Sequence, residues 1–196
     1  MLYSLFLHLA DTYSILNVFK FLTVRTGLAM FTSMLVVFLI GTPFIKYFSS
    51  HHIHDPIRED GPADHIIKKI GTPTMGGVLI LIGLFSGILL WGDLFNPYIW
   101  FLIFIVGAFG LLGAYDDYRK IKKKNSSGIS SKFKFLWQII LAIIGVLILI
   151  YFVDKSNLQK LYFPFFKNLI INLGWFFIPF YIFIIVGSSN AVNLTD

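Results

Sequence analysis

Long runs of apolar residues, separated by short polar segments, dominate the pattern of this chain. An α-helix needs about 20 apolar residues to cross the hydrocarbon core of a bilayer, and each run approaches that length. Strands of a membrane barrel would be shorter and would alternate in polarity. The pattern predicts an all-α, polytopic integral membrane protein, a single membrane domain over 1–196 with five spanning helices at 27–48, 75–91, 99–115, 135–153 and 173–187.

The composition supports this class of protein. Apolar residues make up 57% of the chain and charged residues only 13%, which excludes an ordinary soluble domain. The chain has no cysteine, so disulfide bonds and thiol chemistry are excluded as well. Two segments lie outside the apolar runs. Residues 1–17 predict either a short amphipathic helix in the membrane interface or a frayed terminus, and residues 154–172 predict an outer loop with a short hairpin around Pro164.

Basic residues are divided unequally between the two sides that these spans define. Of the 16 Lys and Arg residues, eleven fall in or beside the segments 49–71 and 116–134, and five fall on the opposite side. Because cytoplasmic loops carry the excess of Lys and Arg, these two segments are predicted to lie in the cytoplasm and the N-terminus outside. The net charge of +6 then favours anionic lipids or anionic substrates at this face and disfavours nucleic acid as a partner.

Two adjacent carboxylates, Asp116 and Asp117, lie where the third apolar run meets a cluster of bases. Ionisable residues at a membrane boundary are costly unless a counter-charge meets them. On a regular helix adjacent side chains point about 100° apart, so the two cannot chelate one ion unless the helix has already ended. One carboxylate is expected to bind Mg²⁺, which prefers oxygen ligands, and the other to face a nucleophile. The alternative is a solvated helix end paired with Arg119 and Lys120.

Further polar residues flank the other predicted spans on the same side. Lys69 and Thr74 belong to a Gly- and Pro-containing segment before the second span, which predicts either an anion-binding corner or simply a capped helix. Lys132 falls in the first turn of the fourth span, where a cation is unfavourable unless an anion lies nearby. Three residues after the fifth span have a spacing that lets them converge on one ligand: Asn190, Asn193 and Asp196.

Four strings, in this order, resemble the polyprenyl-phosphate N-acetylhexosamine-1-phosphate transferase superfamily over the whole chain. They are GTPTMGG at 71–77, DDYRK at 116–120, GISSKFK at 128–134 with Gln138, and NAVNLTD at 190–196. Each string alone is a modest signal, whereas four in order with apolar spans between them are specific. The first string favours the branch that transfers a muramoyl-pentapeptide phosphate.

The resemblance implies an enzyme that moves phospho-N-acetylmuramoyl-pentapeptide from UDP to undecaprenyl phosphate, giving lipid I and UMP, with Mg²⁺ as cofactor. This reaction is the first membrane step of peptidoglycan synthesis. The implied partners are UDP-MurNAc-pentapeptide, undecaprenyl phosphate and membrane lipid at the cytoplasmic face of the bacterial inner membrane, with a homodimer as one option. The implied site has Asp116 and Asp117 as catalytic residues, Asp117 and Asp196 as metal ligands, and for substrate binding Lys69, Thr74, Lys120, Lys132, Asn190 and Asn193.

In length the chain departs from the superfamily, since the resemblance implies ten spans and five are predicted here. We therefore expect an N-terminal part of a longer enzyme, and the resemblance does not imply activity of this chain by itself. Three other hypotheses stay open. One is transfer of N-acetylglucosamine phosphate to a polyprenyl phosphate, another, of a different class, is half of a transporter, and the third is an inactive truncated product. A transporter would place ionisable residues inside the spans, and these runs carry essentially none.

Overall fold

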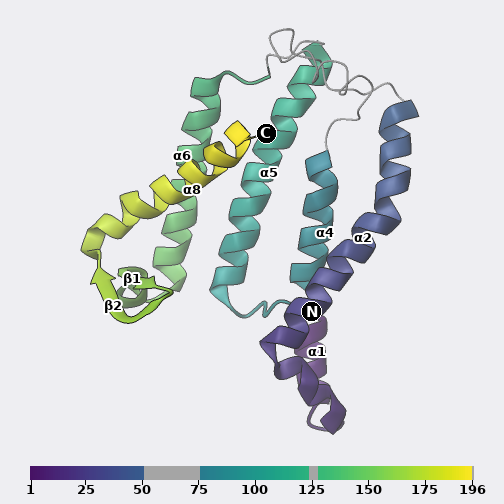
Figure 1. Cartoon of the computed structure of the whole chain (residues 1–196), viewed down its shortest axis with the longest axis vertical. Helices are drawn as coiled ribbons and strands as arrows, with labels where there is room; N and C mark the ends of the chain where they lie inside the picture. The colour runs from purple at the N-terminus through teal and green to yellow at the C-terminus, as the bar shows by residue number, and fades with distance from the viewer. Residues whose placement is uncertain (51–75, 124–127, 196) are drawn as a thin grey trace. The chain divides into compact units, whose positions relative to one another are not determined.

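The computed structural model describes residues 1–50, 76–123 and 128–195 (Figure 1). These residues divide into two compact units. Unit 1 comprises Met1–Ile99 and Gly110–Ser130, and unit 2 comprises Trp100–Phe109 and Ser131–Asp196. Helix α5 (Pro97–Lys123) therefore contributes both of its ends to unit 1 and residues 100–109 to unit 2.

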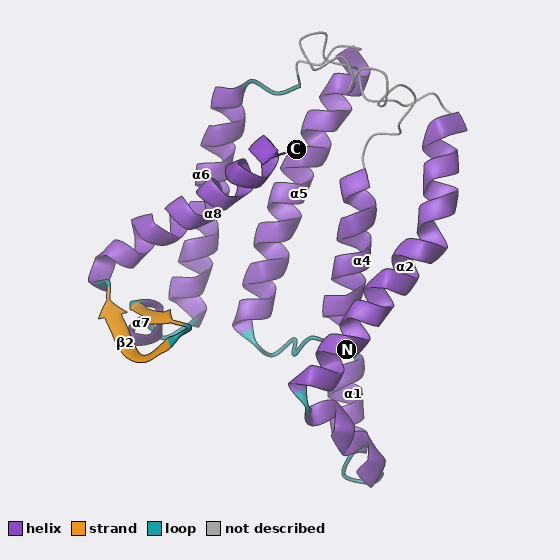
Figure 2. Ribbon diagram, viewed as in Figure 1, coloured by secondary structure: helices purple, strands orange, loops and turns teal. Residues whose placement is uncertain are grey.

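Helices make up most of the described chain (Figure 2). Unit 1 contains α1 (Leu2–Leu9), the 3-10 helix η1 (Ser14–Lys20), α2 (Leu22–Ser50) and α4 (Gly76–Trp91). Unit 2 contains α6 (Ser131–Phe152), α7 (Lys155–Leu158), β1 (Lys160–Phe163), β2 (Phe166–Asn172), the 3-10 helix η2 (Gly174–Phe176) and α8 (Phe177–Thr195).

Among the described residues, four helical segments are long and apolar enough to cross a membrane: Leu22–Ser50, Pro97–Lys123, Ser131–Phe152 and Gly174–Val192. A fifth apolar helix, Gly76–Trp91, is shorter. The predicted all-α fold of a polytopic membrane protein is confirmed. Each of the five helices overlaps one predicted apolar run, while the exact membrane boundaries stay a prediction.

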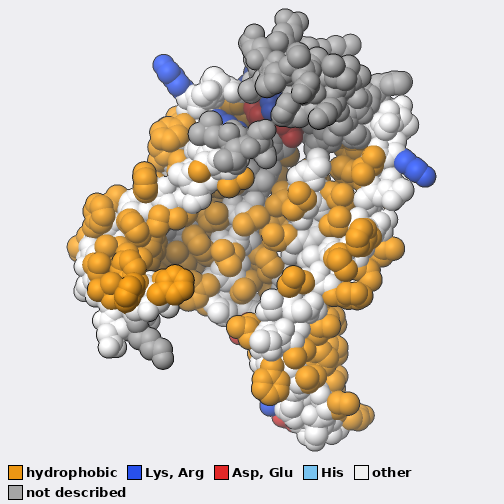
Figure 3. Space-filling model, in the orientation of Figure 1, with side chains coloured by type: hydrophobic (Ala, Val, Ile, Leu, Met, Phe, Trp, Pro, Cys, Tyr) orange, Lys and Arg blue, Asp and Glu red, His pale blue; other side chains and the backbone are white. Residues whose placement is uncertain are grey.

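Large apolar side chains are exposed along these helices. On the face shown in Figure 3, hydrophobic side chains cover much of the helix surface and charged side chains are few. In α2, for example, Phe38 is 72% exposed and Met30 is 69% exposed. Such exposure would be costly in water, but lipid tails are as apolar as these side chains. The surface is therefore that of a protein solvated by lipid.

Small residues bring α2 and α4 together in unit 1. A Cβ atom added at Gly83 would lie 2.7 Å from Val37 Cγ2, and one added at Gly87 would lie 2.8 Å from the carbonyl oxygen of Ala29. Both distances are shorter than any ordinary contact of a Cβ atom, so only glycine fits at either position. Gly83 and Gly87 are one helical turn apart, which is the small-xxx-small spacing that allows membrane helices to approach closely.

The N-terminal segment of unit 1 packs on these two helices. The rings of Phe6 and Phe19 stack with centroids 4.4 Å apart, and the ring of Phe19 stacks on Trp91 of α4 at 5.8 Å. Trp91 Nε1 donates a 2.9 Å hydrogen bond to Thr32 Oγ1 of α2. Because α1 and η1 are helical and held by these contacts, the alternative of a frayed terminus is wrong.

Unit 2 has its core between α6, α7 and the start of α8. Val146, Leu149, Leu158 and Phe177 are buried together there. The hydroxyl of Tyr181 donates a 2.8 Å hydrogen bond to the carbonyl oxygen of Leu158, which ties α7 to α8.

Strands β1 and β2 of unit 2 pair in antiparallel fashion, with Phe163 opposite Phe166. The two-residue turn that joins them begins with Pro164, so the predicted hairpin around this residue is confirmed.

The close approach of α2 and α4 predicts that Gly87→Ala destabilises the protein by about 1–3 kcal/mol, because the new methyl group overpacks the interface. Thermal unfolding of the detergent-extracted protein measures this effect. The matched control is Gly27→Ala in α2, where an added Cβ meets nothing within 4 Å. Gly27→Ala should be neutral or stabilising by up to about 1 kcal/mol, since alanine is the better helix former. Equal melting temperatures for the two variants would contradict the packing described.

Candidate active site

Helix α5 continues without a break past the two aspartates to Lys123. The carboxylates of Asp116 and Asp117 therefore lie on a regular helix, where adjacent side chains diverge by about 100°. The side chain of Asp116 is 13% exposed, whereas that of Asp117 is 33% exposed. The helix has not ended at this point, so the condition under which both carboxylates would chelate one ion is not met. The two groups have different environments and can perform different tasks.

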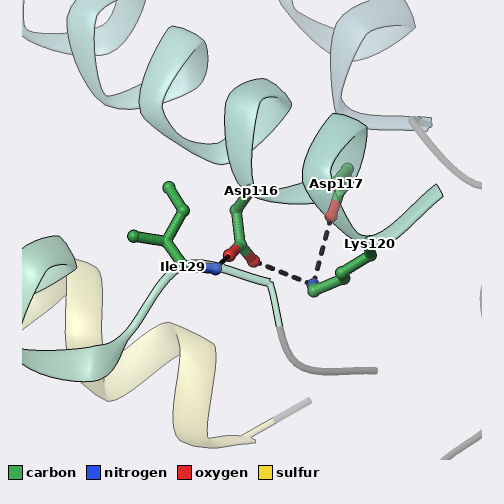
Figure 4. A network of polar contacts seen from close by, with 4 residues as sticks. All are labelled: Asp116, Asp117, Lys120 and Ile129. Carbon is green, nitrogen blue, oxygen red and sulfur yellow. Dashed lines mark hydrogen bonds and ion pairs between the residues drawn. The ribbon is translucent and has the colours of Figure 1, made fainter. Parts of the chain in front are cut away.

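Lys120 binds both carboxylates at once (Figure 4). Its Nζ lies 2.9 Å from Asp116 Oδ2 and 3.3 Å from Asp117 Oδ1. Lys120 is four residues after the first aspartate and three after the second, and these are the two spacings at which helical side chains meet. Among the described residues, Lys120 and not Arg119 forms the ion pairs with the doublet. The alternative of a solvated helix end is right about pairing with Lys120 but wrong about solvation of Asp116.

The second oxygen of Asp116 is held by the main chain beyond α5. The amide of Ile129 donates a 2.6 Å hydrogen bond to Asp116 Oδ1, as Figure 4 shows. The preceding residue, Gly128, lies so close that an added Cβ would be 2.8 Å from Asp116 Cγ and 3.0 Å from Lys120 Cε. A buried carboxylate needs such donors, because an unpaired charge in an apolar environment is strongly unfavourable.

Within the described ranges, the two carboxylates share a single ammonium group, that of Lys120. Among the described residues, Asp117 Oδ2 has no partner, and it belongs to the more exposed carboxylate. No group of three or more His, Cys, Asp or Glu residues able to hold a metal is found in the part of the chain that the structure describes.

The residues present nevertheless fit Mg²⁺. This ion is commonly held by one or two carboxylates, several waters and the phosphates of a substrate, rather than by a complete set of protein ligands. Asp117 offers a hard oxygen with solvent access, as such a site requires. Asp116 offers none, since Lys120 and Ile129 hold both of its oxygens.

A second polar cluster lies in unit 2, between α6 and α8. Asn190 Nδ2 donates 2.8 Å hydrogen bonds to Gln138 Oε1 and to the carbonyl oxygen of Val186. Gln138 is only 2% exposed, and its Nε2 lies 3.4 Å from Ser189 Oγ. Both N–H groups of Asn190 are therefore used within the fold, and only its Oδ1 is left for a substrate.

The other predicted site residues are placed as follows. Lys132 is the second residue of α6 and its side chain is exposed. Asn193 lies in α8, and the described residues do not include its side chain. Three further positions lie outside the described residues: Lys69, Thr74 and Asp196. The substrate-binding and metal-binding roles of all five stay predictions.

Comparison with known proteins assigns this arrangement to a family. The sequence model of glycosyl transferase family 4 matches residues 98–196, which are half of the chain and include the Asp116–Lys120 cluster. The chain belongs to glycosyl transferase family 4. Residues 69–81 of this family 4 chain also match signature 1 of phospho-N-acetylmuramoyl-pentapeptide-transferases. The resemblance inferred from the four strings is thus confirmed.

Curated relatives of this glycosyl transferase family 4 chain carry the same description. The phospho-N-acetylmuramoyl-pentapeptide-transferase of Pelagibacter ubique is 74% identical over all 196 residues, which cover 54% of that protein. The protein of the same name from Caulobacter vibrioides is 49% identical over 92% of the chain and 50% of its own length. A third, from Citrifermentans bemidjiense, is 46% identical over the whole chain and 54% of its own length. The chain therefore spans about half the length of the relatives it matches.

Three groups in the clusters of this family 4 chain were not foreseen as functional from the sequence. Gln138 was only part of a diagnostic string, although a glutamine in an otherwise apolar span is a signal for an interhelical hydrogen bond. Gly128 enters the sequence analysis only as the first residue of the string at 128–134. The amide of Ile129 could not be singled out, because every residue except proline carries the same donor.

The amide network predicts that Asn190→Ala lowers the stability of the protein by about 1–3 kcal/mol, because Gln138 Oε1 would be buried without a donor. Thermal unfolding in detergent measures the loss. The double variant Gln138→Leu/Asn190→Leu is the control, since removing both polar partners should restore much of the stability. An Asn190→Ala protein with wild-type stability and weakened substrate affinity would instead assign Asn190 to the substrate alone.

Proposed function

We propose that this chain is the part of a phospho-N-acetylmuramoyl-pentapeptide-transferase that carries its aspartate pair. The whole enzyme transfers phospho-N-acetylmuramoyl-pentapeptide from UDP to undecaprenyl phosphate, with lipid I and UMP as products. The observation that carries the proposal is the Asp116–Asp117 pair sharing Lys120 at the end of an apolar helix, in a chain that matches the transferase signature. The names of the relatives support the same reaction.

The proposed reaction is a direct displacement. A phosphate oxygen of undecaprenyl phosphate attacks the β-phosphorus of the UDP-linked substrate, and the bond from that phosphorus to the bridging oxygen breaks. The bridging oxygen leaves with UMP. Because the second pKa of a phosphate monoester is about 6, the attacking oxygen is largely ionised at neutral pH and needs no strong base. Positioning of the two phosphates and neutralisation of their charge are then the main tasks of the protein.

The predicted site residues have the following roles in this proposal. Asp117 and Asp196 would hold Mg²⁺, which when bound would neutralise charge on the pyrophosphate. Lys120 fixes the direction of Asp117. Lys69, Thr74 and Lys132 bind substrate phosphates. Asn190 and Asn193 bind the nucleotide, Asn190 through its remaining oxygen.

The proposed topology follows from the distribution of charge. Five spans cross the bacterial inner membrane, and the basic segments at 49–71 and 116–134 face the cytoplasm, where a UDP-linked substrate would be found. The uneven count of Lys and Arg supports this orientation. Reporter fusions to residues 124–127 and to the β1–β2 turn would test it, since only the former should report the cytoplasm.

Transfer of N-acetylglucosamine phosphate is the second candidate within the same chemistry. The match to signature 1 at residues 69–81 favours the muramoyl substrate. Assay of the full-length protein with each UDP-sugar decides between them. Lipid-linked product from UDP-N-acetylglucosamine alone would refute the muramoyl assignment.

The proposed metal role of Asp117 predicts that Asp117→Asn in the full-length enzyme lowers UMP release at least about 100-fold, because an amide is a poor ligand for Mg²⁺. Release of UMP from the UDP-linked substrate measures the effect at several Mg²⁺ concentrations. The matched control is Asp117→Glu, which keeps the negative charge and should retain more activity than Asp117→Asn. Turnover of Asp117→Asn at the wild-type rate would remove this carboxylate from the mechanism.

The proposed phosphate contact of Lys132 predicts that Lys132→Ala raises KM for the UDP-linked substrate about tenfold, the loss expected for one hydrogen bond to a charged group. Because the Lys132 side chain is exposed, its removal should leave folding unchanged. Lys134→Ala, which removes a charge two residues away, is the control for a general electrostatic effect. An unchanged KM for Lys132→Ala would contradict the assignment.

A further inference from the structure

The carboxylate of Asp116 is more tightly held than that of any other acidic residue in the described parts of the chain. Ile129 donates a 2.6 Å hydrogen bond to Oδ1, and Lys120 Nζ lies 2.9 Å from Oδ2. One contact comes from α5 itself and the other from main chain thirteen residues further along. These two contacts fix the direction of the carboxylate plane, which one contact alone would not.

The contact from Ile129 depends on the absence of a side chain at Gly128. A Cβ at this position would overlap Asp116 Oδ1 and would lie 2.8 Å from Asp116 Cγ and 3.0 Å from Lys120 Cε. Any residue larger than glycine must therefore displace either the Asp116 carboxylate or the main chain at 128–129, and either movement disturbs the hydrogen bond from Ile129 to Asp116.

Displacement of this main chain would also reach the other aspartate. Lys120 Nζ bridges Asp116 Oδ2 and Asp117 Oδ1, so a rotation of the Asp116 carboxylate changes where the ammonium group settles. The side chain of Asp117 is the more exposed of the two, and Lys120 is its only ion-pair partner among the described residues. The direction of the Asp117 carboxylate therefore depends on the contact between the Ile129 amide and Asp116.

We propose that Gly128 and the Ile129 amide form a backbone clamp on Asp116 that, through Lys120, positions Asp117 for the reaction. Gly128 is thus a positioning residue. It touches no substrate in this proposal, and its effect is transmitted through the two contacts of Asp116. The inference rests on the proposed transferase function for its kinetic consequence, but the clamp itself is a structural property that can be measured without any substrate.

Hydrogen exchange of the Ile129 amide in the full-length protein tests the clamp. The amide should exchange slowly in the wild type, and both Asp116→Ala and Gly128→Ala should accelerate its exchange. Gly113→Ala is the matched control on α5, since a Cβ there meets nothing within 4 Å, and it should leave exchange at Ile129 unchanged. Fast exchange in the wild type, or an unaltered rate in Gly128→Ala, would overturn the clamp.

Kinetics of the same variants test the positioning role. Gly128→Ala should lower kcat for UMP release about tenfold or more at temperatures where the variant is fully folded, with KM for the UDP-linked substrate unchanged, because small misplacements of a catalytic group reduce turnover. Gly113→Ala should keep the wild-type kcat. A raised KM, a lowered melting temperature that accounts for the loss, or wild-type turnover would each overturn the role of Gly128. Absence of UMP release from the wild type would instead refute the proposed function. The clamp would then be tested by hydrogen exchange of the Ile129 amide alone.

Discussion

Compensation of charge at the end of an apolar helix is the interaction on which this structure depends. A carboxylate at such a position loses most of its hydration, so a partner must replace the lost water. Lys120 supplies that partner for both aspartates from within α5, and the Ile129 amide donates to the other oxygen of Asp116. Of the two side chains, that of Asp117 is the more exposed. One local network thus produces both a stable helix end and an unequal pair of acids.

The rest of the fold is stabilised by interactions that do not depend on the exclusion of water. The hydrophobic effect does not drive helices together in lipid, so close packing and hydrogen bonds must do so. In unit 1, Gly83 and Gly87 let α4 approach the backbone of α2. In unit 2, Gln138 and Asn190 link α6 to α8 by an amide pair. The small and polar residues of this chain therefore determine which helices pack together. The abundant apolar residues make the helix surfaces compatible with lipid.

The sequence alone predicts the class, the apolar helices and the aspartate pair, because run length, residue type and neighbouring charge determine these features locally. It does not predict which faces of the helices meet. A helix that is apolar on all sides carries no periodic signal for its packed face, so the partners of Gly87 and Gln138 could not be named in advance. The same holds for the Ile129 amide, whose donor is common to almost every residue. The apolar run at 99–115 also does not show where α5 ends, since polar residues at 116–123 form helix as readily as the run before them.

The contact between Ile129 and Asp116 has a consequence for how the two loop positions tolerate mutation. The donor belongs to the main chain, so any residue except proline can replace Ile129 and still present it. Position 128 should tolerate almost no substitution, because any side chain there would occupy the space beside Asp116. A random library over these two neighbours should therefore return functional clones that are diverse at one position and almost invariant at the other.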